Sequence, residues 1–368
     1  MPNILLALEW YDHRIHRGVA RVAARHGWHL TCPSGQPGFQ PVPEGWRGDG
    51  AITLLGDRWM GRLLRRRVPL VDIGLTATAR VPHTVVDNAA AAALAHAHLR
   101  SRGWRRFACL SNPGVPMFDE RSDAFIARLA AEGLPCPLWT TAGLARRLRQ
   151  AAPLALFAVQ DALGADAIAA ALGAGLRVPE DVAIMGVDDC DLICEALPVP
   201  LASVDTDQDG LGVAAAERLA RILAGRPDDG AMLRHPPRAV LARPSAEAYG
   251  TTHTGLRAAL DLARRQPACG VRALASAAGL SPQGLDLVCR RELGVNPGTM
   301  LRRLRLDGAR RLLDDGRPVR AVAEALGLAS ASGLCALIRR ETGQTPRRWR
   351  ASASATTASS RPRPRPRR

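Results

Sequence analysis

Short apolar runs alternate with amphipathic stretches along the first 250 residues of the chain. Runs typical of buried strands lie at residues 3–8, 51–55, 70–73, 84–86, 107–110, 156–159 and 182–187. Between them, apolar residues recur at helical spacing at 15–26, 90–99, 123–131 and 162–172. Because strand and helix alternate throughout, the pattern predicts a parallel α/β sheet with helices on both faces.

The last third of the chain contains an internal repeat. The segment VRALASAAGLS from Val271 matches VRAVAEALGLA from Val319, and RRELGVNP from Arg290 matches RRETGQTP from Arg339. A repeat of this period indicates one supersecondary unit used twice. Each copy has the pattern of a helix-turn-helix: a short helix, a turn at a glycine, and a second helix that ends in two arginines. Two such units predict a protein that reads two successive turns of DNA major groove.

Charge separates the same two parts of the chain. Residues 251–368 carry 23 arginines against 8 acidic residues, whereas residues 1–250 carry 27 arginines against 26. Nearly all of the net charge of +16 therefore falls on the C-terminal part, which is typical of a domain that binds a polyanion. A G+C-rich genome would explain why the chain uses arginine instead of lysine, but not this asymmetry.

Composition argues against several other classes of protein. The sequence has no run of about 18 apolar residues, so we expect no membrane span. Its N-terminus lacks basic residues before the first apolar run, so we expect a cytoplasmic protein without a signal peptide. The eight cysteines include no C-x-x-C pair, and no glycine-rich phosphate loop follows any strand. The sequence therefore predicts neither a metal site nor a cofactor.

Polar side chains follow the C-terminal ends of the predicted strands, which is where ligands bind in parallel α/β sheets. Carboxylates, amides and an arginine can bind paired hydroxyl groups, and an aromatic ring can cover the apolar face of a sugar. Each carboxylate taken alone has an alternative role, because acidic residues after strands often cap the next helix. The predicted sugar-binding residues are Trp10, Tyr11, Asp12, Arg14, Asp87, Asn88, Arg121, Gln160 and Asp188.

Three segments carry a resemblance to a known family. Residues 87–110 (DNAAAAALAHAHLRSRGWRRFACL), 121–125 (RSDAF) and 178–205 (VPEDVAIMGVDDCDLICEALPVPLASVD) resemble the effector domain of LacI/GalR-type repressors. The resemblance implies a type I periplasmic-binding-protein fold, in which two α/β lobes close on a sugar and the chain crosses between them three times. It also implies that Asp188 and Arg121 bind sugar hydroxyls from the C-terminal lobe.

The repeat region resembles the all-α double helix-turn-helix domain of the AraC family. The resemblance implies that Ser281 caps a first recognition helix, that a linker helix spans 302–315, and that a second recognition helix spans 330–340. Basic residues are common in the family at the positions of Leu287 and Ala336, so we expect reduced direct base readout. The core residues implied are Leu274, Leu285 and Val288.

Residues predicted to bind DNA fall into two groups. Polar residues early in each recognition helix are candidates near the bases, and arginines at the helix ends are candidates for phosphate contacts, which position a protein without specifying sequence. The full set is Ser281, Gln283, Asp286, Arg290, Arg291, Ser332, Arg339, Arg340, Arg347 and Arg348.

An AraC-type domain behind a LacI-type effector domain is the order found in XylR-like regulators. We therefore predict a two-lobed effector domain at 1–247, a DNA-binding domain at 248–350 and a disordered Arg/Pro tail at 351–368. The expected protein is a homodimeric, sugar-responsive regulator that binds operator DNA. A pentose such as xylose is the favoured effector, and RNA polymerase is a partner if the regulator activates transcription.

Two alternatives stay open from the sequence. The effector pocket could be degenerate, which would leave a DNA-binding protein without a sugar response. Some AraC-type domains are fused to DJ-1-like modules that carry a reactive cysteine, and Cys109 ends a strand-like run (FACL) here. No histidine lies near Cys109 in sequence, which favours a buried thiol over an enzyme nucleophile.

Overall fold

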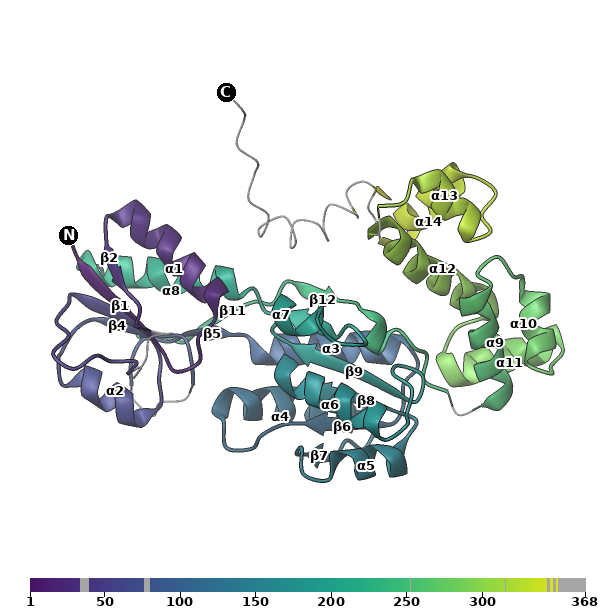
Figure 1. Cartoon of the computed structure of the whole chain (residues 1–368), viewed down its shortest axis with the longest axis horizontal. Coiled ribbons are helices and arrows are strands. Elements are labelled where there is room, and N and C mark those ends of the chain that lie inside the picture. The colour runs from purple at the N-terminus through teal and green to yellow at the C-terminus, as the bar shows by residue number, and fades with distance from the viewer. Residues whose placement is uncertain are drawn as a thin grey trace. The chain divides into compact units, whose positions relative to one another are not determined.

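The computed structural model describes residues 1–33, 40–75, 80–251, 253–314, 316–342, 345–346 and 349. The chain divides into two compact units, Met1–Ala248 and Tyr249–Arg368 (Figure 1). The predicted Arg/Pro tail lies outside the described residues, as do Arg347 and Arg348.

The first lobe of the N-terminal unit is built on four parallel strands in the order β2-β1-β3-β4. These strands are β1 (Asn3–Leu8), β2 (His29–Thr31), β3 (Gly50–Leu54) and β4 (Leu70–Asp72). Alternate residues of β1 face opposite sides of the sheet. Ile4, Leu6 and Leu8 pack on α1 (His13–His26) and α8 (Gln208–Leu223), whereas Leu5 and Ala7 pack on α2 (Asp57–Leu64).

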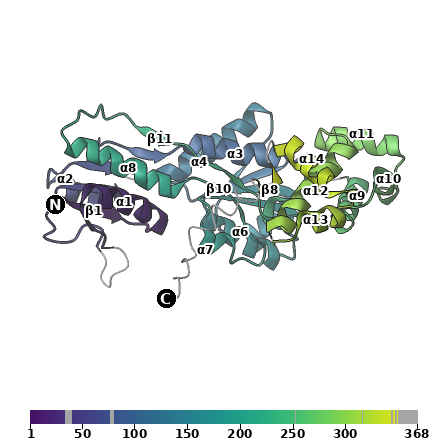
Figure 2. The same cartoon turned by 90° about the horizontal axis from the view of Figure 1, so that it is seen from above.

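The second lobe contains a six-stranded sheet in the order β12-β10-β9-β8-β6-β7. Its pairings are parallel except between β10 (Ala202–Asp205) and β12 (Ala239–Leu241). The other strands are β6 (Phe107–Leu110), β7 (Leu138–Trp139), β8 (Leu154–Ala158) and β9 (Val182–Val187). Figure 2 shows α3 (Asn88–Ser101) and α4 (Pro116–Ala131) on one side of this sheet and α6 (Asp161–Gly173) on the other. The helices α5 (Leu144–Ala151) and α7 (Asp191–Cys194) complete the lobe.

The chain crosses between the two lobes three times. It leaves the first lobe after β5 (Thr84–Val86), returns through α8 after β10, and leaves again between β11 (Leu233–His235) and β12. Strands β5 and β11 pair in parallel beside the crossings. The crossing segments therefore lie where the two lobes face each other, and the residues that follow them, Asn88 and Gln208, lie at that boundary.

Helices α1 and α8 pack with their backbones close together, although they lie far apart in sequence. A Cβ atom at Gly18 would clash with the backbone carbonyl of Asp209, and one at Gly212 would clash with that of Ile15. Arg17 forms an ion pair with Asp209 across the same helix pair, at 2.9 Å. Glycine is therefore required at both positions for this approach.

The C-terminal unit is helical in its described residues. Its elements are α9 (Thr254–Arg265), α10 (Val271–Ala277), α11 (Pro282–Leu293), α12 (Pro297–Asp314), α13 (Val319–Ala325) and α14 (Ala331–Thr342). Two hydrophobic clusters divide the unit, and α12 contributes Met300 to the first cluster and Leu313 to the second. The predicted core residues Leu274, Leu285 and Val288 are buried in the first cluster, which confirms that prediction.

Candidate functional site

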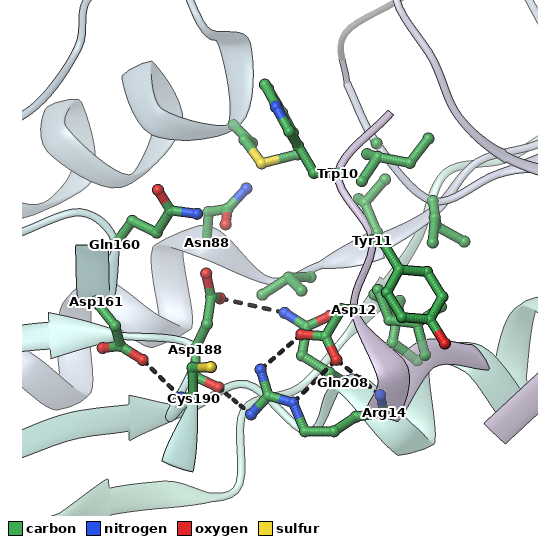
Figure 3. A pocket seen from close by; sticks show the side chains of 18 of the residues that line it. Trp10, Tyr11, Asp12, Arg14, Asn88, Gln160, Asp161, Asp188, Cys190 and Gln208 are labelled. Carbon is green, nitrogen blue, oxygen red and sulfur yellow. Dashed lines mark hydrogen bonds and ion pairs between the residues drawn. The ribbon is translucent and has the colours of Figure 1, made fainter. Parts of the chain in front are cut away.

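A cavity of about 230 Å³ lies between the two lobes of the N-terminal unit (Figure 3). Asp87 does not line it, because its carboxylate accepts the N–H of Ala90 at 2.9 Å and caps α3. Asp87 is therefore a helix-capping residue, which is the alternative role that the sequence left open for each carboxylate. The other predicted residues all line the cavity: Trp10, Tyr11, Asp12, Arg14, Asn88, Arg121, Gln160 and Asp188.

A buried ion pair occupies the wall contributed by the second lobe. Arg121 donates from Nη2 to Oδ1 of Asp188 at 2.9 Å and from Nη1 to Oδ2 at 3.1 Å. Its Nε donates to Asn88, and Nη1 also donates to the carbonyl of Val159. Because the Arg121 side chain is only 3 % exposed, the carboxylate of Asp188 supplies the counter-charge that makes its burial tolerable.

Part of this network is still available to a ligand. A guanidinium group has five N–H donors, and the four contacts of Arg121 leave one N–H of Nη2 without a partner among the described residues. The amide of Gln160, at the start of α6, likewise has no hydrogen bond within the described part of the chain. The wall can therefore both donate to hydroxyl groups and accept from them.

Asp12 and Arg14 face the cavity but bind protein groups. Asp12 accepts from Nε and Nη2 of Arg14 at 3.1 and 2.7 Å, and it caps α1 through the backbone N–H of Arg14. Nη1 of Arg14 then donates to the carbonyls of Asp188 and Asp189, at 2.7 and 2.5 Å. Since both aspartates have positive φ (99° and 49°), Arg14 links the first lobe to a strained turn of the second (Figure 3).

The two predicted aromatic residues differ in their placement. Trp10, whose exposed fraction is 49 %, lies parallel to Phe118 of the second lobe, with ring centroids 6.3 Å apart. The hydroxyl of Tyr11 instead makes a hydrogen bond to Nδ1 of His16 at 3.0 Å, and its ring points away from Asp188 (Figure 3). Trp10 therefore carries its ring across the boundary between the lobes, whereas the Tyr11 ring turns back to α1.

Two further polar residues line the cavity and were not predicted. Gln208 donates to Asp188 at 3.2 Å and to Thr206 at 2.9 Å. Asp161 accepts from Ser203 and from the backbone N–H of Cys190, and so fixes the turn that follows β9. Burial, with the nearby charge of Asp188, raises the pKa of Asp161 to about 7. Asp161 could have been found from the sequence, because it directly follows the predicted cavity residue Gln160. Gln208 gave no such signal, because it follows a strand that was not predicted.

The alternative of a cysteine nucleophile finds no geometric support. Cys109 is fully buried in the core of the second lobe and does not line the cavity. Burial raises the pKa of its thiol well above the usual range, so the reactive thiolate is disfavoured. Within the described ranges, no cluster of histidine, cysteine or carboxylate side chains is arranged to hold a metal ion. No helix in the same residues is long and apolar enough to cross a membrane.

The first predicted recognition helix, α11, exposes polar side chains on both sides of the exposed Leu287. Ser281 caps it by accepting the N–H of Gly284 at 3.0 Å, as the sequence predicted. Gln283 is exposed, and Asp286 accepts from Nε of Arg290 at 2.6 Å. Arg291 is exposed beside Glu292, at 3.2 Å.

The second predicted recognition helix, α14, repeats this arrangement. Ser330 is positioned like Ser281 and accepts the N–H of Gly333 at 3.1 Å. Ser332 and Arg339 are exposed, and Arg340 pairs with Glu341 at 3.0 Å. Both helices therefore begin at a serine cap and end in exposed arginines.

Comparisons with known proteins agree with both units. A family described as periplasmic binding protein-like domain matches residues 96–246, and a family described as helix-turn-helix domain matches residues 274–352. The xylose operon regulatory protein of Escherichia coli (strain K12) is 24 % identical over 367 residues, covering 92 % of this chain and 94 % of the relative. The HTH-type transcriptional regulator MalR of Streptomyces coelicolor is 30 % identical over 206 residues. The match covers 51 % of this chain and 59 % of the length of MalR.

Solved structures share the fold. A structure of the xylose-binding transcription activator xylR matches with a TM-score of 0.63 and 22 % identity, covering 95 % of this chain and 98 % of its own. The complex of the transcriptional regulator CelR with cellobiose matches 66 % of this chain and 84 % of its own, with a TM-score of 0.56 and 23 % identity. The chain is therefore a XylR-like transcriptional regulator, in which a periplasmic-binding-protein-like effector domain precedes an AraC-type helix-turn-helix DNA-binding domain.

Proposed function

We propose that the effector domain binds a monosaccharide between its lobes and that this binding controls how the protein occupies operator DNA. The observation that carries the proposal is the buried Arg121–Asp188 pair, which faces the cavity that Trp10 also lines. Charged hydrogen-bonding groups set beside an aromatic ring suit a ligand with polar edges and an apolar face.

The size of the cavity favours a single sugar ring. Pockets for drug-sized ligands have volumes of roughly 300–1,000 Å³, and this cavity, at about 230 Å³, is smaller. The curated relative and the solved structure that match nearly the whole chain are both named for xylose, whereas CelR was solved with the disaccharide cellobiose. A pentose such as xylose is therefore the effector that we favour.

Sugar binding would act on DNA through lobe closure. A sugar that contacts both lobes binds the closed form more tightly, and only that difference in affinity shifts the equilibrium. In a homodimer in the cytoplasm, closure would change the spacing of the two DNA-binding domains on an operator. RNA polymerase would be a further partner if the regulator activates transcription.

Calorimetric titration of the full-length protein with xylose, glucose and cellobiose tests the proposal. We expect xylose to bind most tightly and Asp188→Asn to weaken binding by about tenfold to hundredfold. That range corresponds to about 1.5–3 kcal/mol for the loss of a charged hydrogen bond. Asparagine is preferred to alanine here because it keeps an acceptor for the buried guanidinium of Arg121.

A matched control is Asp181→Asn, which removes an aspartate paired with the half-exposed Arg177 outside the cavity. This variant should bind xylose like the wild type. Full sugar affinity in Asp188→Asn would contradict the proposed placement of the site. If none of the three sugars binds or changes operator binding, the pocket is degenerate with respect to them.

A further inference from the structure

Leu287 is the most exposed large apolar side chain of the DNA-binding unit among the described residues. It lies on α11, and 69 % of it is exposed. On the opposite side of the helix, Leu285 and Val288 are buried in the core. Its exposed neighbours one turn away are Gln283 and Arg291, so the outward face carries an apolar group between polar ones.

The internal repeat places an apolar residue at the same position of α14. Ala336 aligns with Leu287 when Arg339 is aligned with Arg290, and Ala336 is also exposed. It lies between the exposed Ser332 and Arg340. A single exposed leucine is ordinary on a protein surface, but the same placement in both copies is a second, independent observation.

Several hydrogen-bonding groups near Leu287 are already engaged within the protein. The hydroxyl of Ser281 caps α11, and the carboxylate of Asp286 is bound by Arg290 at 2.6 Å. Asp286 is therefore poorly placed to accept from a base, and Nε of Arg290 is turned back onto its own helix. The uncommitted group at the centre of the outward face is the isobutyl side chain of Leu287.

We propose that Leu287 and Ala336 contact thymine methyl groups in two successive major grooves and so specify A·T base pairs at those positions. The inference rests on DNA binding by the two helix-turn-helix units. Thymine presents a methyl group at its major-groove edge, and apolar side chains are its complement there, whereas arginine prefers guanine. Because successive major grooves of one face repeat at about 10–10.5 base pairs, the two thymines should be separated by about that distance.

Replacement of thymine by deoxyuridine tests the proposal, because it removes the methyl group and keeps the base pair. The preferred operator is first selected from random DNA with the full-length protein, and each thymine is then replaced singly. For the wild type, we expect about fourfold weaker binding at the thymine under Leu287, which corresponds to about 0.8 kcal/mol for one buried methyl-sized group. In Leu287→Gln, which replaces the apolar side chain with a polar one of similar length, the penalty at that thymine should disappear.

The second contact and the control use the same DNA. Ala336→Gln, which puts a polar side chain in place of the methyl group, should abolish the penalty at the second thymine while leaving the first unchanged. Leu192→Gln makes the same change at a similarly exposed leucine (72 %) of α7 in the effector domain, and it should keep both penalties. An equal deoxyuridine penalty in the wild type and Leu287→Gln, or no penalty at any thymine, would overturn the inference. If selection returns no preferred sequence, sequence-specific DNA binding fails as well.

Discussion

At the scale of single residues, the cavity is organised by groups that hold one another. Asp188 accepts from Arg121, Thr206 and Gln208, while Asp161 holds the turn that follows β9. A sugar would therefore enter a preformed network in which few groups need to reorient. Preorganisation of this kind reduces the free energy that binding must spend on ordering side chains.

The raised pKa of Asp161 makes stability depend on pH. In the unfolded chain an aspartate ionises near pH 3.9, but in the folded protein the pKa is about 7, because burial and then Asp188 disfavour the charge. The folded state therefore binds the proton more tightly, and this contribution to stability is lost as pH rises from about 4 through 7. We expect Asp161→Asn to lose less unfolding free energy than the wild type between pH 5 and pH 8.

Urea unfolding at the two pH values measures this difference. The control is Asp166→Asn, an exposed aspartate on the same helix, which should keep the pH dependence of the wild type. Equal pH dependence in Asp161→Asn and the wild type would show that Asp161 ionises normally in the folded protein.

Sequence reasoning located most of the polar residues that line the cavity, because polar residues that follow parallel strands converge at one edge of a sheet. Arg121, in the helix that follows β6, and Asp188, directly after β9, lie far apart in sequence but meet at that edge. Sequence reasoning did not distinguish Asp87, which caps a helix, from Asn88, which lines the cavity. That distinction depends on the direction of each side chain, which residue type alone does not determine.

At the scale of elements, the serine caps set where the recognition helices begin. Ser281→Ala removes an acceptor for one otherwise unpaired N–H of α11 and should lower the unfolding free energy of the DNA-binding unit by about 1 kcal/mol. Ser332→Ala, in which an exposed serine inside α14 is replaced, should change it by less than about 0.5 kcal/mol. Thermal unfolding of both variants compares the two effects, and equal destabilisation would contradict the capping role.

The close packing of α1 on α8 makes a second prediction. Gly18→Ala introduces a methyl group against the backbone of Asp209, which has no freedom to move aside, so we expect a loss of about 1–3 kcal/mol in stability. Gly173→Ala, also within a helix but facing open space, should be neutral or slightly stabilising. Circular dichroism melting curves of the two variants distinguish steric exclusion from a general intolerance of alanine.

The sequence predicted strands correctly where the chain has long apolar runs. It failed where tertiary contacts determine whether a segment forms a strand or a helix. The predicted strand at 182–187 coincides with β9, whereas the short edge strands β2 and β7 carry exposed or half-buried residues and no apolar run. No helix was predicted at the position of α8, whose first turns contain Gly210 and Gly212, and glycine normally weakens a helix. The linker helix α12 begins at Pro297, five residues before the predicted start, since proline is favoured in the first turn.

At the scale of the whole molecule, the charge difference between the two parts predicts how DNA binding responds to salt. Affinity should fall steeply with salt, because arginine contacts to phosphates release condensed counterions. Deleting residues 352–368, which contain five arginines, should weaken binding to all sequences by a similar factor and reduce the salt dependence. Electrophoretic mobility shifts with operator and unrelated DNA at several salt concentrations measure both effects, and a selective loss on the operator would argue against this role for the tail.

The return of α8 to the first lobe has a consequence for biosynthesis. The ribosome produces β1 and α1 first, but the helix that covers them begins only at Gln208. At roughly 5–20 residues per second, the apolar face formed by Ile4, Leu6 and Val19 stays uncovered for on the order of 10–40 s, until α8 has been synthesised. The part of the protein that is translated first is therefore completed late, and during that interval the nascent chain is a natural client for chaperones that shield exposed apolar strands.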